Sequence, residues 1–343
     1  MTPKERLFNA LNDRPIDRIP TFCSGCSQTV TVESMEAIGV YWPEAHRDPG
    51  KMAELSESTY DLTGLEVAGV PYCLTIEAEA LGCYTDFGSK RDSIPLITGT
   101  PYTDFDEVVI PEDLLMAKRV PVILEAISIL KERVGDTLPV VAGMTGPFTL
   151  AGHLSGIEPL LKGLLRKPDK YMGFIQLAAE IGSIYGQALR EAGADVVSIA
   201  DPSASSDMIS PRMFRGFVKP AIAGMVEAIG GASFLHICGN CAPILGDMAE
   251  TGVDSISISD KVDARQAKEL VSGKAKITGN ISTTVTLLLK GPEDVRGDCR
   301  AAIEAGVDIL APSCGIAPVT PNKNIRALVE AARRHPFPPS GAP

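Results

Sequence analysis

A short pattern, Glu-x-Gly-x-Asp, occurs three times in the second half of the chain, over residues 191–195, 250–254 and 304–308. Each copy follows a predicted helix and comes just before an apolar run. A glycine at this place closes a helix in the left-handed conformation and turns the chain into the next strand. The repeats therefore predict units in which a helix leads into a strand, and such units build parallel α/β sheets.

Eight short apolar runs have the length and residue types of buried strands. They cover residues 18–22, 65–70, 139–144, 195–200, 233–238, 255–259, 275–278 and 307–311. The predicted helices cover residues 2–11, 48–61, 111–134, 168–191, 211–229 and 322–334. Strands that alternate with helices in this way are typical of a (β/α)8 TIM barrel, an α/β fold of ~250 residues plus insertions. An open doubly wound sheet is the alternative.

We expect a single barrel domain over residues 1–343. Residues 72–107 are irregular and rich in Gly, Pro and Thr. They are predicted to form a β-meander inserted after the second strand, of the kind that covers an active site. The proline-rich residues 336–343 are predicted to be a loose tail.

The overall composition argues against several classes of protein. A net charge of -11 disfavours nucleic-acid binding, which needs clustered Lys and Arg. The chain has no run of ~18 uncharged apolar residues, and its start lacks the apolar core of a secretory signal. We therefore expect a cytoplasmic protein that does not span a membrane. Eight cysteines are too sparse for a disulfide scaffold and are predicted to be thiols or metal ligands.

His236 and Cys238 lie two residues apart on the strand predicted over residues 233–238. Side chains alternate between the two faces of a strand, so this imidazole and thiol point the same way. Cys314 follows the strand predicted over residues 307–311 at the same relative place. One His and two Cys suit Zn²⁺, with one position left for water or substrate. Any one of them alone would be interpreted as a core residue, but together they predict a catalytic zinc site.

The other cysteines offer two alternative interpretations. Cys238 and Cys241 form a C-x-x-C pair, as do Cys23 and Cys26. Such a pair could be redox-active, or the two pairs could form a closed four-Cys zinc site. A redox pair needs a low-pKa thiol in a thioredoxin-like setting, and this chain is too long and barrel-like for one. The four-Cys site would leave His236 and Cys314 without a role. The remaining cysteines are predicted to be packing residues, namely Cys73, Cys83 and Cys299.

Polar residues also stand at the predicted carboxyl ends of strands, where the chemistry of a barrel takes place. Asp260 could supply the fourth position of a zinc site, or it could cap the next helix or pair with Lys261. Asp201 could orient a ligand or cap a turn. We expect His46 and His153 at the surface. The candidate substrate-binding residues are Asp201, Asn240, Asp260 and Asn280.

Three segments of the chain resemble the uroporphyrinogen decarboxylase superfamily. They are the opening Thr2-Pro-Lys-Glu-Arg-Leu, the segment Arg18-Ile-Pro and the turn Gly143-Met-Thr-Gly-Pro-Phe, and the resemblance extends over nearly the whole length. The decarboxylases are metal-free, whereas His236-x-Cys238 with Cys314 resembles the zinc signature of the methylcobamide:coenzyme M methyltransferases of methanogens. Cobalamin-independent methionine synthase is similar in using a His-x-Cys and a later Cys on a barrel.

The resemblance implies a zinc-dependent methyltransferase with His236, Cys238 and Cys314 as catalytic and metal-binding residues. It implies that a methylated corrinoid, either methylcobalamin or a methyl-corrinoid protein, is the donor, and that the thiol of coenzyme M is the acceptor in methanogenesis from methylated compounds. Two alternatives are a metal-free decarboxylase and a corrinoid-binding module without catalysis. A corrinoid carrier would contain an Asp-x-His-x-x-Gly segment, and none of the four histidines lies in one.

Overall fold

The structure is a computed structural model that describes residues 1–23, 28–89, 91–102 and 104–335. The predicted tail over residues 336–343 and Cys26 of the second C-x-x-C pair lie outside the described residues. Among the described residues, no helix is both long and apolar enough to cross a membrane.

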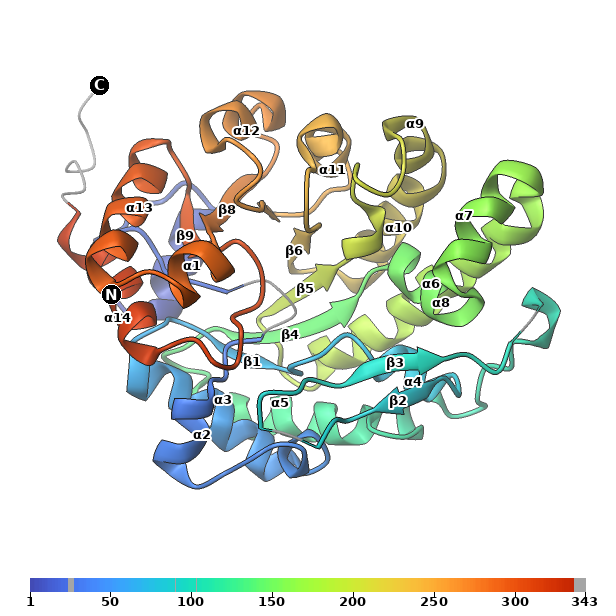
Figure 1. Ribbon diagram of the computed structural model, residues 1–343, viewed down its shortest axis with the longest axis horizontal. Helices are drawn as coiled ribbons and strands as arrows, with labels where there is room; N and C mark the ends of the chain where they lie inside the picture. Colours follow the sequence, from blue (N-terminus) through green and yellow to red (C-terminus); the bar gives the residue numbers. More distant parts are fainter. Residues whose placement is uncertain (24–27, 90, 103, 336–343) are drawn as a thin grey trace.

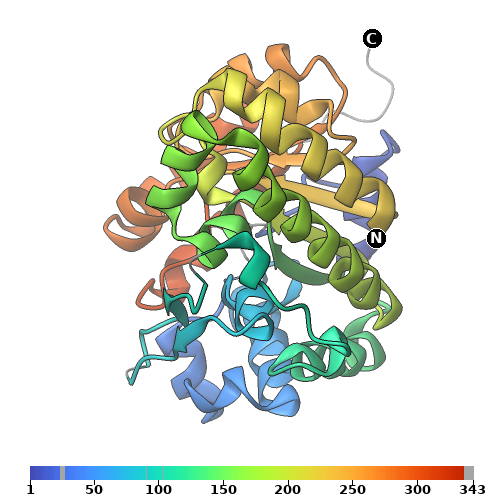
Figure 2. The same ribbon diagram turned by 90° about the vertical axis from the view of Figure 1, so that its right-hand side faces the viewer.

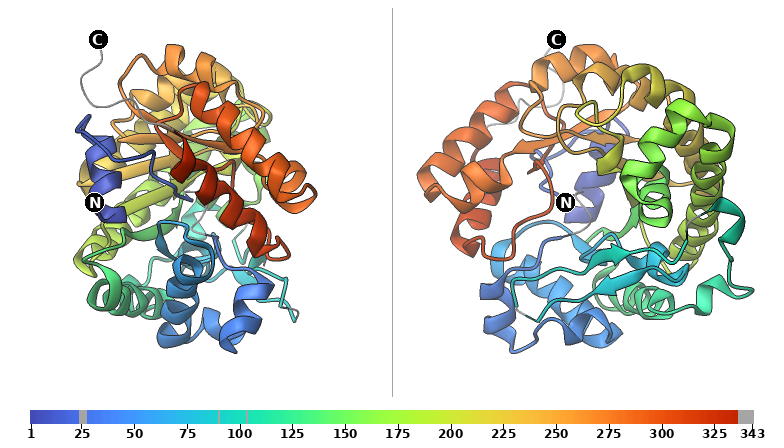
Figure 3. Two further views of the ribbon diagram at one scale, coloured as in Figure 1. Left: turned by 90° about the vertical axis from the view of Figure 1, so that its left-hand side faces the viewer. Right: turned by 45° about the vertical axis from the view of Figure 1, so that its right-hand side comes forward.

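A seven-stranded parallel sheet forms the centre of the molecule (Figure 1). Its strands are adjacent in the order in which they occur along the chain, and the sheet is curled (Figure 3). The strands are β1 (Ala68–Val70), β4 (Val140–Thr145), β5 (Val196–Ala200), β6 (Ala232–His236), β7 (Ser255–Ser257), β8 (Lys276–Ile281) and β9 (Ile309–Pro312). Nearly all of their residues are buried because helices cover the sheet from outside, as expected for a parallel sheet.

The helices surround the curled sheet (Figures 2 and 3). They are α1 (Pro3–Leu11), α2 (Val32–Ile38), α3 (Pro49–Thr63), α4 (Ile76–Ala80), α5 (Val120–Val134), α6 (Pro147–Ser155), α7 (Ile157–Arg166), α8 (Pro168–Glu191), α9 (Pro211–Met213), α10 (Lys219–Ile229), α11 (Leu245–Ala249), α12 (Ala264–Val271), α13 (Pro292–Glu304) and α14 (Asn322–Arg334). Short π-helical segments cover Phe214–Val218 and Thr283–Leu288. Single 3₁₀ turns cover Glu44–His46, Phe105–Glu107, Leu114–Met116, Pro202–Ala204 and Ala242–Ile244.

The sequence predicts a strand over residues 18–22, but these residues make only one isolated parallel bridge, between Thr21 and Leu310 of β9. Pro20 has no N–H to donate to a ladder. The N–H of Thr21 donates instead to the Glu66 carboxylate at 3.1 Å. The described residues therefore form a curled seven-stranded sheet, with residues 18–22 lying against its β9 edge.

Two predicted helices are shorter than expected or interrupted. The helix predicted over residues 111–134 begins only at Val120, because Lys118 adopts a left-handed φ of +51° and turns the chain first. The helix predicted over residues 211–229 is divided into α9 and α10 by a π-helical segment. Pro220 has no N–H to donate to the carbonyl four residues earlier, so the regular α-helical pattern cannot pass through it unchanged.

Residues 72–107 leave the sheet after β1. Besides α4 they contain a two-stranded antiparallel sheet of β2 (Tyr84–Asp86) and β3 (Leu96–Gly99), visible in Figure 1. The segment is attached to α6, because the Thr100 hydroxyl donates to the Leu154 carbonyl at 2.6 Å. The described residues thus form two strands where the sequence predicts a meander.

The three Glu-x-Gly-x-Asp repeats fasten neighbouring strands together at their amino ends. Their glycines have the predicted positive φ, which is +115° at Gly193, +86° at Gly252 and +94° at Gly306. Each aspartate pairs twice with one residue of the preceding strand: its N–H donates to the carbonyl, and its carboxylate accepts from the N–H at 2.7 to 3.0 Å. The pairs are Asp195 with Val140, Asp254 with Ser233, and Asp308 with Ile277.

We expect Asp308→Ala to lower the free energy of unfolding by about 1–3 kcal/mol, because the Ile277 N–H would lose its acceptor. Asp308 also accepts from Lys268, a partly exposed contact that contributes less. Asp308→Asn keeps an acceptor oxygen and should lose less than the alanine variant. Urea unfolding of the three proteins measures the difference. Equal midpoints for wild type and Asp308→Ala would show that this pair does not stabilise the sheet.

His46 is fully buried, so its predicted surface position is wrong. Its ring stacks on Trp42 with centroids 4.8 Å apart and meets the edge of Tyr72 at 6.1 Å. Neither ring nitrogen has a hydrogen-bond partner among the described residues. Burial, helped by the charge of Arg119, lowers the pKa of His46 to about 3. His153 is also partly buried, and burial lowers its pKa to about 4.

Because the pKa of His46 is about 3 in the folded protein and ~6.5 in an unfolded chain, the unfolded state binds an extra proton between these values. This histidine therefore costs stability as the pH falls below ~6.5, by about 2 kcal/mol between pH 7.5 and pH 5. We expect His46→Phe, which keeps an aromatic ring in the stack, to lose about 2 kcal/mol less than wild type over that interval. Urea unfolding at the two pH values tests this. His335→Phe serves as the control, and an equal loss in wild type and His46→Phe would contradict the prediction.

Candidate metal centre

The three side chains predicted as ligands meet at the carboxyl edge of the sheet. His236 is the last residue of β6, and Cys238 follows two residues later. His236 Nε2 lies 2.9 Å from Cys238 Sγ, which lies 3.3 Å from Cys314 Sγ. Within the part of the chain that the structure describes, they form the single group of three or more His, Cys, Asp or Glu side chains that could share a metal ion.

The loop after β6 holds Cys238 in place through contacts of Gly239. Gly239 has a left-handed φ of +78°, and a Cβ there would lie 2.4 Å from Asp207 Oδ2, so glycine is required. The Gly239 carbonyl accepts a hydrogen bond from Ser259 Oγ at 2.6 Å. The same Asp207 oxygen accepts from the Asn240 N–H at 3.1 Å. The backbone is therefore fixed immediately after Cys238.

Cys314 reaches the cluster from β9, which ends two residues earlier. The Ser313 N–H donates to the Ile281 carbonyl at 2.7 Å, which extends the pairing with β8 up to Cys314. Two strands separate β9 from β6 in the sheet. The curl of the sheet therefore brings together two ligands from one strand end and a third from another.

The surroundings of Cys314 favour its thiolate form. The hydrogen bond with Cys238 lowers the pKa of the Cys314 thiol well below its ordinary value. Burial acts in the opposite direction, and the charge of His236 adds to the lowering. The thiolate is the form of cysteine that binds a metal ion.

The donor atoms suit a zinc ion in type and approximately in spacing. Ideal tetrahedral bond lengths would place nitrogen and sulfur ~3.5 Å apart and the two sulfurs ~3.8 Å apart. The distances of 2.9 and 3.3 Å are shorter by about half an ångström, which small side-chain rotations span. The other ring nitrogen, Nδ1, lies 3.0 Å from Ser257 Oγ, so Nε2 is the nitrogen that faces the sulfurs.

Cys241, the second thiol of the C-x-x-C pair, is not part of the cluster. It is fully buried, and burial raises its pKa to about 12, which disfavours the thiolate that redox chemistry needs. Among the described residues, Cys238 is therefore grouped with His236 and Cys314. The cysteines expected to be packing residues are all buried: Cys73, Cys83 and Cys299.

Asp201, which follows β5, is fully buried against the start of α6. Its carboxylate accepts hydrogen bonds from the N–H groups of Phe148 and Thr149 at 3.1 and 2.7 Å, and from the Thr149 hydroxyl at 2.7 Å. From the end of the neighbouring strand β5, it thus supplies hydrogen-bond acceptors for the N–H groups at the amino end of α6. Burial raises the pKa of Asp201 to about 6. A Cβ on Gly146 would lie 2.3 Å from Asp201 Cβ, which explains the glycine in this turn.

The other three candidate substrate residues make local contacts. Asn240 Oδ1 accepts from the Ala242 N–H at 3.3 Å, and Asn280 Nδ2 donates to the Val262 carbonyl at 2.8 Å. Asp260 is exposed and, with Asn280, lines a cavity of about 480 Å³. Asp260 does not belong to the cluster of candidate ligands. A role in substrate binding for all four residues, and the fourth zinc position for Asp260, stay predictions.

Ser257, whose hydroxyl contacts His236, is not among the site residues predicted from the sequence. The signal was present in the alternation of Ser and Ile over residues 255–259. Alternate residues of a strand share a face, so the three serines point the same way. Polar side chains on the inner face of a buried strand, next to the strand that carries His236, indicate a hydrogen-bonding role there.

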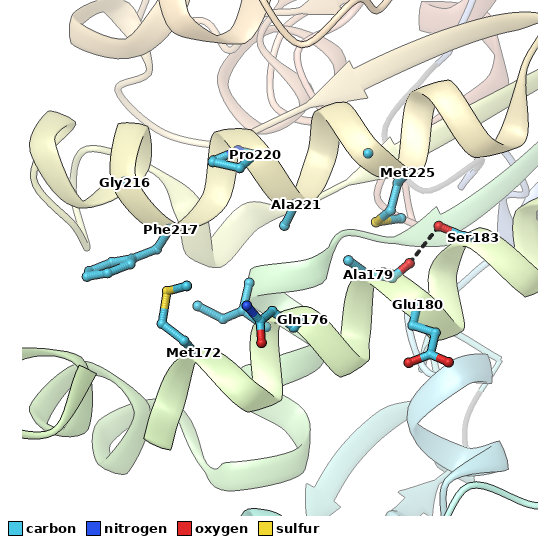
Figure 4. Close-up of a pocket in the computed structure, with 12 residues that line it drawn as sticks. Met172, Gln176, Ala179, Glu180, Ser183, Gly216, Phe217, Pro220, Ala221 and Met225 are labelled. Carbon is cyan, nitrogen blue, oxygen red and sulfur yellow. Dashed lines mark hydrogen bonds between the residues drawn. The ribbon is translucent and has the colours of Figure 1, made fainter. Parts of the chain in front are cut away.

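An apolar groove of about 400 Å³ lies on the outside of the molecule, between α8 and α10 (Figure 4). Met172 and Gln176 project into it from α8, and Phe217 and Met225 from the opposite side. None of the predicted site residues lines this groove. It is therefore separate from the candidate metal centre.

The chain belongs to the uroporphyrinogen decarboxylase (URO-D) family, whose model matches residues 2–335. It is 42% identical to the methylcobamide:CoM methyltransferase MtaA of Methanosarcina barkeri, over 96% of this chain and 97% of that protein. It is 37% identical to MtbA of Methanosarcina acetivorans, over 98% and 99%. A solved methyltransferase structure from Methanosarcina mazei matches with a TM-score of 0.93 and 41% identity, over 97% of this chain and 98% of that one. Within the family, the chain stands among the methylcobamide:CoM methyltransferases, as the resemblance predicts.

Gly146→Ala should lower the free energy of unfolding by about 2–4 kcal/mol, because its Cβ would displace Asp201 from the amino end of α6. Gly224→Ala in α10 is the matched control, since nothing lies within 4 Å of its Cβ. The control should be neutral or more stable by up to about 1 kcal/mol. Urea unfolding of both variants measures the effect, and equal stabilities would show that the turn tolerates a side chain.

Proposed function

We propose that this protein transfers a methyl group from a methylated corrinoid to the thiol of coenzyme M, with Zn²⁺ held by His236, Cys238 and Cys314. The donor is methylcobalamin or a methylated corrinoid protein, and the setting is methanogenesis from methylated compounds in the cytoplasm. One observation carries the proposal: an imidazole and two thiols meet at the carboxyl edge of the sheet. The identity of 42% with MtaA over almost the whole chain supports it.

The proposed ligands suit the activation of a thiol. A free thiol is mostly protonated at neutral pH and is then a poor nucleophile. A bound zinc ion would lower the pKa of an incoming thiol and so favour its nucleophilic thiolate form. Two of the three protein donors are themselves sulfur atoms, which keep the site electron-rich and the substrate sulfur nucleophilic.

The residues of the chain prepare the site for the ion. His236 must offer Nε2 without a proton, so its proton resides on Nδ1, which donates a hydrogen bond to the Ser257 hydroxyl at 3.0 Å. The hydrogen bond with Cys238 lowers the pKa of the Cys314 thiol, which favours the thiolate form that binds a metal ion. The imidazole is buried to 1% exposure, which keeps water away from this ligand.

The transfer itself takes place between the two substrates. The sulfur of coenzyme M donates an electron pair to the methyl carbon, the new S–C bond forms, and the Co–C bond breaks. The electron pair of the broken bond stays on cobalt, and cob(I)alamin leaves. We propose that Asp201, Asn240, Asp260 and Asn280, which lie at or just after strand ends, contribute to substrate binding.

We further propose that residues 1–343 form one TIM-barrel domain, with residues 72–107 inserted after the second strand. Residues 18–22 would take the eighth strand position, between β9 and β1. Two contacts support this arrangement: Thr21 bridges to Leu310 of β9, and its N–H binds the side chain of Glu66, two residues before β1.

Metal analysis and a turnover assay test the proposed function. We expect about one zinc ion per chain in the wild type and in Cys241→Ala, and its loss in Cys238→Ala and Cys314→Ala. Absorbance should report demethylation of methylcobalamin by the wild type only when coenzyme M is supplied. Turnover of a tetrapyrrole carboxylate after chelation would instead support a metal-free decarboxylase. Corrinoid binding without turnover would support a binding module.

A further inference from the structure

Serine and isoleucine alternate over residues 255–259, in β7 and the two residues after it. Ile256 and Ile258 are fully buried, and the serines face the opposite way. Each serine hydroxyl has a partner on a neighbouring segment: Ser255 Oγ lies 2.7 Å from Thr278 Oγ1, Ser257 Oγ lies 3.0 Å from His236 Nδ1, and Ser259 Oγ donates to the Gly239 carbonyl at 2.6 Å.

The contact between Ser257 and His236 is set by the register of the sheet. The two residues are direct partners in the parallel pairing of β6 with β7. A slip of one residue would place an isoleucine beside the imidazole. Ser257 is fully buried and His236 is 1% exposed. Removal of the hydroxyl would therefore leave the ring nitrogen with neither a protein partner nor bulk water.

We infer that Ser257 and Ser259 are positioning residues of the metal site, an inference that rests on the proposed zinc-dependent function. The Ser257 hydroxyl accepts a hydrogen bond from the Nδ1–H of His236, so that the Nε2 lone pair, on the side of the two sulfurs, is free to bind the ion. Ser259 fixes the Gly239 carbonyl and with it the backbone immediately after Cys238. β7 and the residues that directly follow it thus orient two of the three ligands.

A hydroxyl is chemically suited to this place. Metal-binding histidines commonly donate their second N–H to a carboxylate, a backbone carbonyl or water. A zinc ion with two cysteine thiolates and a neutral imidazole has no net charge, and a substrate thiolate makes it negative. Ser257 orients the imidazole without adding the further negative charge that a carboxylate would bring.

Zinc affinity, measured by competition with a chromophoric chelator, tests the inference without relying on turnover. We expect Ser257→Ala to bind zinc roughly 10- to 100-fold more weakly than wild type, and Ser259→Ala to bind it more weakly as well. Ser255→Ala is the matched control, because this serine faces the same way on the same strand but contacts Thr278. Its affinity should equal that of wild type. With Co²⁺ in place of zinc, the absorption bands should shift in Ser257→Ala and stay unchanged in Ser255→Ala.

Ser257→Thr and Ser257→Val separate the hydroxyl from general packing, because the two side chains have the same shape and only threonine keeps the hydroxyl. We expect threonine to bind zinc at least roughly tenfold more tightly than valine. Equal affinities for this pair, or an equal loss in Ser255→Ala and Ser257→Ala, would overturn the inference. A wild type that binds no zinc would refute the proposed metal site and this inference with it, whereas a zinc-binding wild type matched by its variants refutes only the inference.

Discussion

The candidate metal centre depends on the curl of the parallel sheet. Two strands lie between β6 and β9. In a flat sheet with strands ~4.8 Å apart, their ends would be separated by roughly 14 Å. The thiols that follow them lie 3.3 Å apart. Because the inward-facing side chains of a curled sheet converge at its carboxyl edge, residues far apart in sequence can bind one ion. In a zinc finger, closely spaced residues of a local motif bring the ligands together. Here the curvature of the sheet brings them together.

The contacts that hold the URO-D family fold together and the proposed metal ligands lie in different residues. The contact of Gly146 with Asp201 belongs to the fold, since it joins the turn after β4 to the end of β5. The proposed chemistry resides in three side chains at two other strand ends. The family includes proteins named as decarboxylases and as methyltransferases, so one fold carries different chemistry according to the groups placed on it.

Features encoded by neighbouring residues could be predicted from the sequence, and so could the meeting of Cys314 with His236 and Cys238, because each segment follows a predicted strand. Contacts between particular distant groups within the sheet could not. Strand alternation alone predicts that His236 and Cys238 face the same way. Uninterrupted apolar runs identify strands such as β4 and β5. Residues 18–22 fail as a strand because the distant Glu66 captures a backbone N–H. Likewise, no local pattern sets the β6–β7 register that places Ser257 beside the imidazole.

The aspartates of the three repeats, each bonded to the preceding strand at its amino end, have a consequence for how this scaffold diversifies. Each Glu-x-Gly-x-Asp repeat joins its strand to the preceding one with two hydrogen bonds of its own. These joints lie at the edge opposite the metal ligands. Loops at the ligand-bearing edge can therefore be exchanged without loss of these aspartate hydrogen bonds. The arrangement is modular, so a new substrate range can evolve by loop replacement while the scaffold keeps its stability.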